Sequence, residues 1–457
     1  MRNKKLGDVL RKISPPPMIV ISFLLVILLG TLLLMLPVST RLRVATPFAD
    51  CLFTATSATC VTGLIIRDTY NYWSVFGQSI ILLLIQVGGL GLVTITLFVG
   101  NLLKRKFGLK ALTLAQETTS YDSRAGVGKI LRYVVLFSVS VEAVGAIILM
   151  FPFVKIYGNA GIFKAIFISV SAYCNAGFDL MGSSGAFSNL ASLNGNPLVL
   201  ITVMSLIVIG GLGVLVMLDC VKAVTSKILT LHSKVILTLT AVLIVGGAFL
   251  FLMSEYYNPQ TIGGMDAGGK VLNSFFASVT ARTAGFSTVS NAAMYDRSKL
   301  LIIALMFIGA APGSTGGGVK ITTFWVVVMT IWSYLRGKKE TVIGRSRVRT
   351  EVVYRALTMM ILMLALIFAS AALIYSNEVT VREISVLDTL YEVFSATCTV
   401  GLSADLTPTL LTSSRYILAA DMLLGRVGLV TFAFSLITRH VRGSDNEVLP
   451  EGSITVG

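Results

Sequence analysis

The chain has 457 residues, of which 55% are hydrophobic and 13% are charged, and it carries a formal net charge of +15 at pH 7. A soluble protein has a charged share nearer about 25%. This composition excludes an ordinary soluble protein and is typical of an all-α membrane protein that crosses the bilayer several times.

The positive charges gather in five stretches of the chain, and their position has a topological meaning. Lys and Arg residues flank the cytoplasmic ends of membrane helices, so we expect all five stretches, and with them both termini, to be cytoplasmic. Contact with anionic membrane lipid accounts for these stretches better than nucleic acid does, and we expect no nucleic-acid partner. The stretches cover residues 2–12, 104–129, 221–234, 336–355 and 439–442.

The sequence offers few residues that could act as catalytic groups or metal ligands. The five cysteines form no CxxC pair and the only histidines are His232 and His440, so neither a zinc site nor a disulfide framework is indicated. No nucleophile, base or metal cluster stands out in the sequence. We therefore expect a protein that is not an enzyme.

Four apolar runs predict the first membrane spans of four successive units. Each run has about 20 residues, enough to cross a hydrocarbon layer of roughly 30 Å as a helix. The first run resembles a signal peptide, but it is too long for the apolar core of one, and no small-residue cleavage site follows it. The runs cover residues 18–38, 131–154, 235–253 and 356–375.

A short apolar segment follows each run and ends in a glycine turn. With about 12–14 residues, these segments are too short to span the membrane and predict re-entrant helices that enter it and turn back. They align on four glycines spaced 108–116 residues apart, Gly63, Gly177, Gly285 and Gly401. Ten positions earlier stand the rings Phe53, Phe167, Phe275 and Tyr391, and three positions earlier stand Cys60, Cys174, Arg282 and Cys398.

A second glycine-rich signature follows each turn and predicts a second span. It reads QVGGLGLVT, VIGGLGVLV, FIGAAPGSTGGGVK and LLGRVGLVT. Two spans per unit return the chain to the same side, so the repeats are parallel and eight spanning helices surround a central pore. The expected parts are a cytoplasmic N-terminus (1–17), repeat 1 (18–103), repeat 2 with its preceding cytoplasmic linker (104–220), repeat 3 with an interrupted second helix (221–335), repeat 4 with its preceding basic linker (336–440) and a cytoplasmic tail (441–457).

Glycine turns at membrane depth indicate a path for cations. Irregular backbone is tolerated in a membrane only where it is buried in protein or lines a watery path. Four turns in register direct carbonyl oxygens at one axis, where they replace the hydration shell of a cation, and glycine permits the positive φ that this needs. Asp179, two residues past Gly177, is either an attractant for cations at the outer mouth or a capping residue of its loop.

The four degenerate turns on a helix–pore loop–helix unit resemble those of the Trk/Ktr/HKT potassium transporters over residues 18–440. Eight spans without an additional N-terminal helix pair resemble the Ktr-type membrane subunit. The resemblance implies a potassium-channel-like pore fold in which backbone carbonyls form a selectivity filter for K⁺, supported by the residue three positions before each glycine. The implied ligands are Val61, Thr62, Gly63, Asn175, Ala176, Gly177, Thr283, Ala284, Gly285, Thr399, Val400 and Gly401, and the implied supports are Cys60, Cys174, Arg282 and Cys398.

The same resemblance implies a plasma-membrane homodimer that sits on a cytosolic nucleotide-binding ring of RCK type, with sodium as an activator in members of the family. No GxxxxGK[ST] or GxGxxG unit is found in this chain, so nucleotide is expected on the partner. In the family, serine at the first turn accompanies sodium transport, and the glycines here favour potassium. A sodium-selective relative stays open, whereas a proton-coupled secondary transporter would need inverted repeats and intramembrane acids.

Arg282 departs from the small residue found in the other three turns. A guanidinium aimed at the ion would repel it, so we expect the side chain to point behind the turn toward an acidic or carbonyl partner. Glu142 and Glu392 are the candidate acids. The alternative is a side chain that extends to the outer surface.

An interruption in the third repeat predicts a gate. Five glycines and a proline within residues 309–318 cannot propagate a stable helix, and we expect helix to resume at Ile321. Such a break below the turns would plug the pore; a kink for close helix crossing is the alternative. Arg426, at membrane depth, needs an acceptor, and the loop carbonyls are the expected ones. The implied gate residues are Gly309, Pro312, Gly313, Ser314, Thr315, Gly316, Gly317, Gly318, Lys320 and Arg426.

Overall fold

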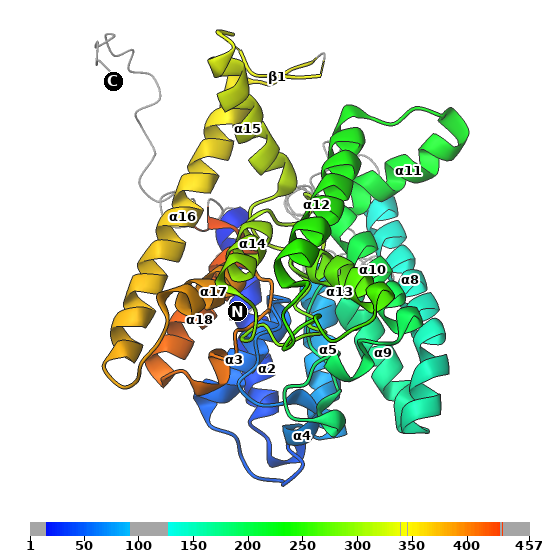
Figure 1. Ribbon diagram of the computed structural model, residues 1–457, viewed down its shortest axis with the longest axis vertical. Coiled ribbons are helices and arrows are strands. Elements are labelled where there is room, and N and C mark those ends of the chain that lie inside the picture. Colours follow the sequence, from blue (N-terminus) through cyan, green and yellow to red (C-terminus); the bar gives the residue numbers. More distant parts are fainter. Residues whose placement is uncertain (1–14, 92–126, 339, 345, 430–431, 433–457) are drawn as a thin grey trace, which may run out of the picture.

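The computed structural model describes residues 15–91, 127–338, 340–344, 346–429 and 432, and every structural statement below refers to these residues. Helices dominate the described chain, and its one sheet is a short hairpin of β1 (Val342–Ile343) and β2 (Ser346–Arg347). In Figure 1 this hairpin and the adjoining helix ends project from one end of the molecule, and α4 (Thr69–Tyr72) lies at the opposite end. The all-α class expected from the sequence is confirmed.

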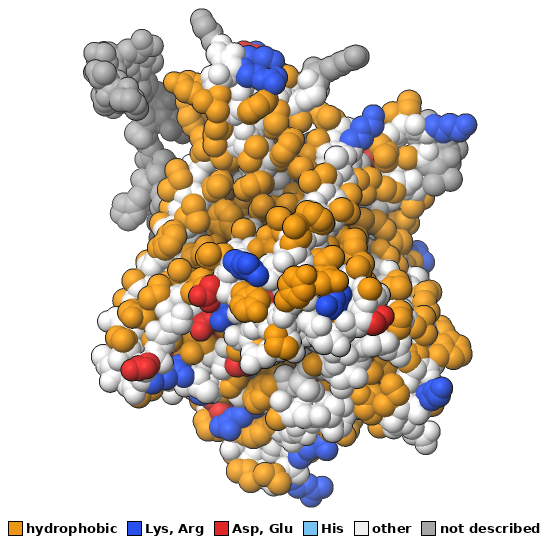
Figure 2. All heavy atoms as spheres, viewed as in Figure 1, with side chains coloured by type: hydrophobic (Ala, Val, Ile, Leu, Met, Phe, Trp, Pro, Cys, Tyr) orange, Lys and Arg blue, Asp and Glu red, His pale blue; other side chains and the backbone are white. Residues whose placement is uncertain are grey.

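Four long helices confirm the four predicted spans. They are α2 (Pro15–Leu34), α8 (Val127–Tyr157), α12 (Leu231–Glu255) and α16 (Thr350–Val379), and each is long and apolar enough to cross a membrane. Much of their surface is apolar and exposed, as at Leu25, Phe249 and Phe368. Figure 2 shows such hydrophobic side chains over much of one face. Because water does not favour so large an apolar surface, lipid is its natural cover.

Four short helices occupy the positions of the predicted re-entrant segments, with 12 or 14 residues each. They are α3 (Phe48–Thr59), α9 (Ala160–Tyr173), α13 (Ala267–Thr280) and α17 (Val386–Thr397). In three of them the predicted ring is buried, but in α13 the fully buried ring is Phe276 and not Phe275. α13 also ends five positions before its glycine, whereas the other three short helices end four positions before theirs, so the link from helix to turn glycine is one residue longer in the third repeat.

The second helix of each repeat is short or broken. These helices are α5 (Val75–Leu90), α10 (Pro197–Leu212), α14 (Asp296–Phe307) and α18 (Thr412–Val427). Gly91, Gly213 and Gly428 follow three of them with φ of 82°, 81° and 90°, a conformation that ends a helix. After Gly213 the chain continues at an angle of 98° as α11 (Val214–Ser226), a bend that the sequence pattern does not predict.

In the third repeat, a long segment without helix follows the second helix. Here α14 stops at Phe307, and helix resumes as α15 (Ile321–Leu335), at the predicted residue. Single turns of 3-10 helix complete the list of elements: η1 (Pro37–Ser39), η2 (Gly182–Ser184), η3 (Ala191–Leu193) and η4 (Thr407–Thr409).

Contacts between repeats follow a cycle. The second helix of each repeat packs against the short helix of the next, so that α5 contacts α9, α10 contacts α13, and α14 contacts α17. The cycle closes because α18 of the fourth repeat packs against α3 of the first. Each short helix is therefore held between its own long helix and the preceding repeat.

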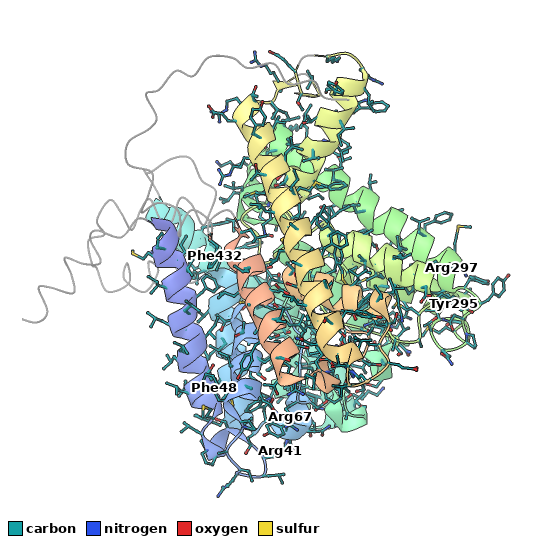
Figure 3. All side chains as sticks on the ribbon, turned by 90° about the vertical axis from the view of Figure 1, so that its left-hand side faces the viewer. Arg41, Phe48, Arg67, Tyr295, Arg297 and Phe432 are labelled. Atoms are coloured by element: carbon teal, nitrogen blue, oxygen red, sulfur yellow. The ribbon has the colours of Figure 1, made fainter. Side chains whose placement is uncertain are left out.

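Polar contacts reinforce the same cycle, mostly through the segments that follow the turns. One bond for each junction of neighbouring repeats is Asn71 Nδ2 to Gly182 O (3.0 Å), Leu190 N to Ser287 O (3.0 Å), Asn291 Nδ2 to Ser403 O (3.0 Å) and Arg415 to Asp50 (2.9 Å). The buried Asp50 carboxylate also accepts from Arg67, which Figure 3 shows at the end of the molecule that carries Arg41. Asp50 thus closes the cycle through its charge-assisted bond with Arg415, and Arg67 of its own repeat holds it in place.

Asp50→Asn should destabilise the fold, because it removes the charge that pairs with Arg67 and Arg415. We expect a loss of roughly 1–3 kcal/mol, seen as a lower melting temperature of the purified protein. The matched control is Glu340→Gln, since the ion pair of Glu340 with Arg347 is exposed on both sides and contributes little. Equal melting temperatures for the two variants would contradict the closing role of Asp50.

Candidate functional site

The four turns share one backbone conformation. Two positions before each turn glycine, φ is positive at a residue that is not glycine: Val61 (56°), Asn175 (58°), Thr283 (69°) and Thr399 (50°). The glycines follow with φ of 100°, 70°, 76° and 92°. Positive φ is rare for β-branched residues and costs energy, so its recurrence at three such residues in equivalent positions marks a constrained site.

The turn glycines pack against one another in the same cyclic order as the helices. A Cβ atom added at Gly63 would lie 2.5 Å from the carbonyl oxygen of Ala176, in the next repeat. The corresponding distances are 2.9 Å from Gly177 to Ala284 O, 2.6 Å from Gly285 to Val400 O, and 2.0 Å from Gly401 to Thr62 O. No side chain fits at these positions. We call this assembly the turn ring: residues 60–64, 174–178, 282–286 and 398–402.

Many polar atoms of the turn ring have no protein partner. In the part of the chain that the structure describes, none of the carbonyls of the twelve predicted ligands accepts a hydrogen bond. The hydroxyls of Thr62, Thr283 and Thr399 are buried and equally unpaired. Buried oxygens are costly when unsatisfied, and a group of carbonyl oxygens that accept no hydrogen bond is suited to a hard cation.

Hydroxyls behind the turns hold their backbone in place, and the sequence reasoning did not single them out. Ser57 Oγ accepts from Gly63 N (3.1 Å), and Ser395 Oγ accepts from Gly401 N (3.0 Å). Ser171 instead donates to Phe178 O (2.7 Å). A serine six positions before the glycine in three of the four repeats was the available signal.

The second signature has a packing role. A Cβ atom added at Gly88, Gly210 or Gly425 would lie 1.9 Å from a carbonyl oxygen, namely that of Thr59, Tyr173 or Thr397. Each of these carbonyls belongs to the last residue of the short helix in the same repeat. Glycine therefore lets the second helix cross directly against the end of the short helix that leads into the turn.

The three cysteines predicted to support the turns are fully buried: Cys60, Cys174 and Cys398. The thiol of Cys174 lies 3.8 Å from Glu142 Oε1, and this carboxylate accepts from Gln86 Nε2 at 3.1 Å. Glu142 therefore stands behind the second turn and does not reach Arg282.

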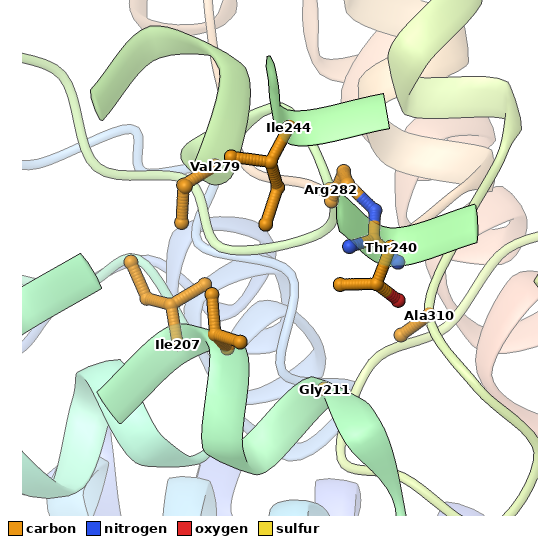
Figure 4. A pocket seen from close by; sticks show the side chains of 8 residues that line it. Ile207, Gly211, Thr240, Ile244, Val279, Arg282 and Ala310 are labelled. Carbon is orange, nitrogen blue, oxygen red and sulfur yellow. The ribbon is translucent and has the colours of Figure 1, made fainter. Parts of the chain in front are cut away.

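Arg282 also has no contact with the other predicted acid. Glu392 accepts from Ser403 and Thr407 and from the backbone of the loop after the fourth turn. The expectation of Glu142 or Glu392 as partner is thus wrong, because both acids serve the turn of their own repeat. Arg282 is 8% exposed, which also excludes extension to the surface, and its Nε has no partner among the described residues. It lines a small pocket between α10 and α12 (Figure 4).

The chain between α14 and α15 lies against the turn ring. A Cβ atom added at Gly316 would lie 2.2 Å from Thr283 Oγ1, and one at Gly317 would lie 2.0 Å from Thr399 Oγ1. The unpaired hydroxyls of two turns therefore face this loop, residues 308–320, which we call the interrupted loop.

The interrupted loop is anchored to the second repeat. Ala311 N donates to Gly211 O (3.0 Å) and Thr315 N to Gly210 O (3.3 Å), both at the end of α10. Further bonds are Thr315 Oγ1 to Tyr173 O (3.2 Å), Val214 N to Gly313 O (3.4 Å), Ser314 Oγ to Ala311 O (2.6 Å), Gly309 N to Val319 O (2.9 Å) and Lys320 Nζ to Gly316 O (2.6 Å). The carbonyl of Pro312 lies against Gly213, and Gly318 lies close to Cys398 O.

Arg426 joins the interrupted loop to the first repeat. Its guanidinium donates to the carbonyl of Thr315 in the loop and to the carbonyl of Gly88 in α5, with a longer contact of 3.4 Å to Gly89 O. One side chain of the fourth repeat thus ties together the first and third repeats beside the turn ring.

Asp179 is 8% exposed, and its Oδ1 accepts from Met181 N at 2.7 Å. Burial raises the pKa of this carboxyl to about 7. This geometry favours the capping interpretation over that of a cation attractant.

Known proteins share both the sequence and the fold. Residues 17–446 match the model of the TrkH family, described as cation transport protein. The chain belongs to this family. The resemblance to Trk/Ktr transporters is thereby confirmed, and so is the expectation that the chain is not an enzyme.

Relatives match over nearly the full length. The chain is 38% identical to the Ktr system potassium uptake protein B of Bacillus subtilis, covering 98% of this chain and 97% of that protein. It is 36% identical to the potassium/sodium uptake protein NtpJ of Enterococcus hirae, covering 98% of each. The crystal structure of the potassium transporter TrkH from Vibrio parahaemolyticus has the same fold, with a TM-score of 0.70 at 15% identity over 92% of this chain and 85% of that one.

Gly425→Ala tests the packing of the second helix on the short one. The added Cβ would collide with Thr397 O, so α18 must shift, and we expect a lower melting temperature and less folded protein in size-exclusion chromatography. Gly246→Ala in α12 is the matched control, because an added Cβ there meets no atom within 4 Å. A Gly425 variant as stable as the Gly246 variant would refute the packing role.

Proposed function

We propose that this protein takes up potassium ions across the plasma membrane through a filter formed by the turn ring. The observation that carries the proposal is the cyclic contact of the four turns, with twelve carbonyls that lack protein donors. The names of relatives at 35–38% identity, potassium uptake proteins of the Ktr system, support the same ion. In this proposal the eight spans of four parallel repeats surround one pore, divided as the sequence repeats divide the chain.

The filter acts by replacing water around the ion. Carbonyl oxygens of Val61, Thr62 and Gly63 and of their equivalents would coordinate K⁺, without any charged side chain among the ligands. The short helices direct their carboxyl ends, which carry partial negative charge, toward the turn ring and add to the attraction. Cys60, Cys174 and Cys398 fill the space behind the filter.

The interrupted loop acts as the gate. It lies against Thr283 and Thr399 of the turn ring and would block the path below the filter. Arg426 and Lys320 hold the loop through carbonyls, and their positive charges add an electrostatic barrier for cations. Release of the loop would open the path.

A cytosolic partner would control the gate. The Ktr-system names of the relatives favour a multi-component transporter, in which this chain forms a homodimer on a nucleotide-binding ring. The projecting hairpin, with the basic residues Arg347 in β2 and Arg349 just after it, is the proposed contact, with anionic lipid as the alternative occupant. Nucleotide binds the ring in this scheme, and sodium acts as an activator. Both termini face the cytoplasm.

Sodium is the second candidate ion. The relative NtpJ is named as a potassium/sodium uptake protein, which makes sodium the alternative ion for the proposed filter. Four glycines in the turns favour potassium for this chain.

Gly63→Ser tests the filter in cells that lack their own potassium uptake. The serine would place its Cβ 2.5 Å from Ala176 O at a φ of 100°, so we expect weaker potassium affinity and a lower preference for potassium over sodium. Uptake by wild-type protein should rescue growth at low potassium. Gly195→Ser, where an added Cβ meets nothing within 4 Å, should behave as wild type. Unchanged ion preference in the Gly63 variant would remove the carbonyl-filter mechanism.

Arg426→Gln tests the gate. The shorter neutral side chain loses the bond to Thr315 O, so the loop is released more often and initial potassium flux rises at equal expression. Arg297→Gln is the matched control, because Arg297 also donates to a carbonyl, that of Ser254, but lies on the surface. Deletion within 311–317 should raise flux in the same way. Lower or unchanged flux in both loop-directed variants, with normal expression, would count against the plug.

A further inference from the structure

A buried positive charge in the third repeat lacks a counter-charge. Arg282 is 8% exposed, its Nε has no hydrogen-bond partner in the described chain, and no described Asp or Glu forms an ion pair with it. Arginine stays charged at any pH that proteins meet. Because a buried charge without a partner is strongly unfavourable, this position favours a compensating group that binds from outside the described protein.

The Arg282 guanidinium lines a small pocket with mostly apolar walls. Residues from three helices and from the interrupted loop form its walls: Ile207, Val208, Gly211, Thr240, Ile244, Val279 and Ala310. Figure 4 shows apolar side chains on one side and Arg282 near Thr240 on the other. The side-chain polar groups are one guanidinium and one hydroxyl, so the pocket offers hydrogen-bond donors without a carboxylate.

We propose that this pocket binds a small monovalent anion, chloride in the cell, held by the Arg282 guanidinium and the Thr240 hydroxyl. A halide needs few donors and tolerates apolar walls, which is what the pocket provides. A phosphate or lipid headgroup carries more oxygens and more charge than one guanidinium and one hydroxyl satisfy.

The bound anion would act on the turn ring. Thr283, the next residue after Arg282, is one of the proposed potassium ligands, and an uncompensated charge beside it in a medium of low dielectric opposes a cation. Pairing with the anion removes that opposition, so chloride should increase the affinity for potassium. This consequence rests on the proposed function, whereas anion binding itself does not.

The test is equilibrium binding of radioactive chloride to the full-length protein in lipid nanodiscs, with gluconate as the background anion. We expect one saturable site per chain. Thr240→Val should weaken binding about tenfold, the effect of losing one hydrogen bond to a charged group, and Arg282→Met should abolish it. Thr238→Val is the matched control, because Thr238 lies on the same helix but is exposed. Arg282→Lys, which keeps the charge, should retain weaker binding.

Absence of saturable chloride binding in the wild-type protein would overturn the proposal, since water alone would then fill the pocket. Binding that is equal in the Thr240 and Thr238 variants would also overturn it. If Arg282→Met fails to fold, the comparison of Thr240→Val with Thr238→Val still tests the proposal.

A second measurement links the anion to potassium. Potassium binding to the same nanodiscs should be several-fold tighter in chloride than in gluconate, and potassium should tighten chloride binding by the same factor. Chloride binding without any potassium uptake in cells would refute the proposed function and leave the anion site standing. Potassium uptake without saturable chloride binding would refute the anion site and leave the proposed function standing.

Discussion

The contact between each turn glycine and a carbonyl of the next turn is the constraint on which the structure depends. Added Cβ atoms would lie only 2.0–2.9 Å from those oxygens, so the four turns are as close as backbone allows. This closeness requires four short helices that arrive from different sides. It also requires second helices that cross them at Gly88, Gly210 and Gly425, and polar bonds that close the cycle at Asp50. The packing of the helices, the position of the interrupted loop and the proposed coordination of the ion all depend on the turn ring.

Spacing along the chain was enough to predict most of the elements. The four long helices, the four short ones and the resumption of helix at Ile321 lie where apolar runs and glycines place them. These features are local, because a run of apolar residues has one favourable environment and a row of glycines cannot sustain a helix. The fourfold recurrence made a weak signal into a strong one.

The sequence pattern did not predict which way a side chain or a helix points in the folded chain. The buried ring stands nine positions before the turn glycine in the third repeat and ten positions before it in the others, a step of about 100° around a helix, so Phe276 lies in the core in place of Phe275. Glu142 and Glu392 were chosen as partners of Arg282 by charge alone, and each proved to serve its own turn. The bend at Gly213 depends on how the interrupted loop packs there, which no local pattern records.

Arg426 holds carbonyls of two repeats with one guanidinium. Since both bonds share the same rigid plane of atoms, movement of the side chain away from Thr315 also disturbs its bond to Gly88. Arg426 would therefore release the interrupted loop and α5 together. Partly displaced positions of the loop would not be stabilised by either bond. Under the proposed gating, the interrupted loop would therefore respond as a switch with two levels, rather than as a valve that can be set anywhere between them.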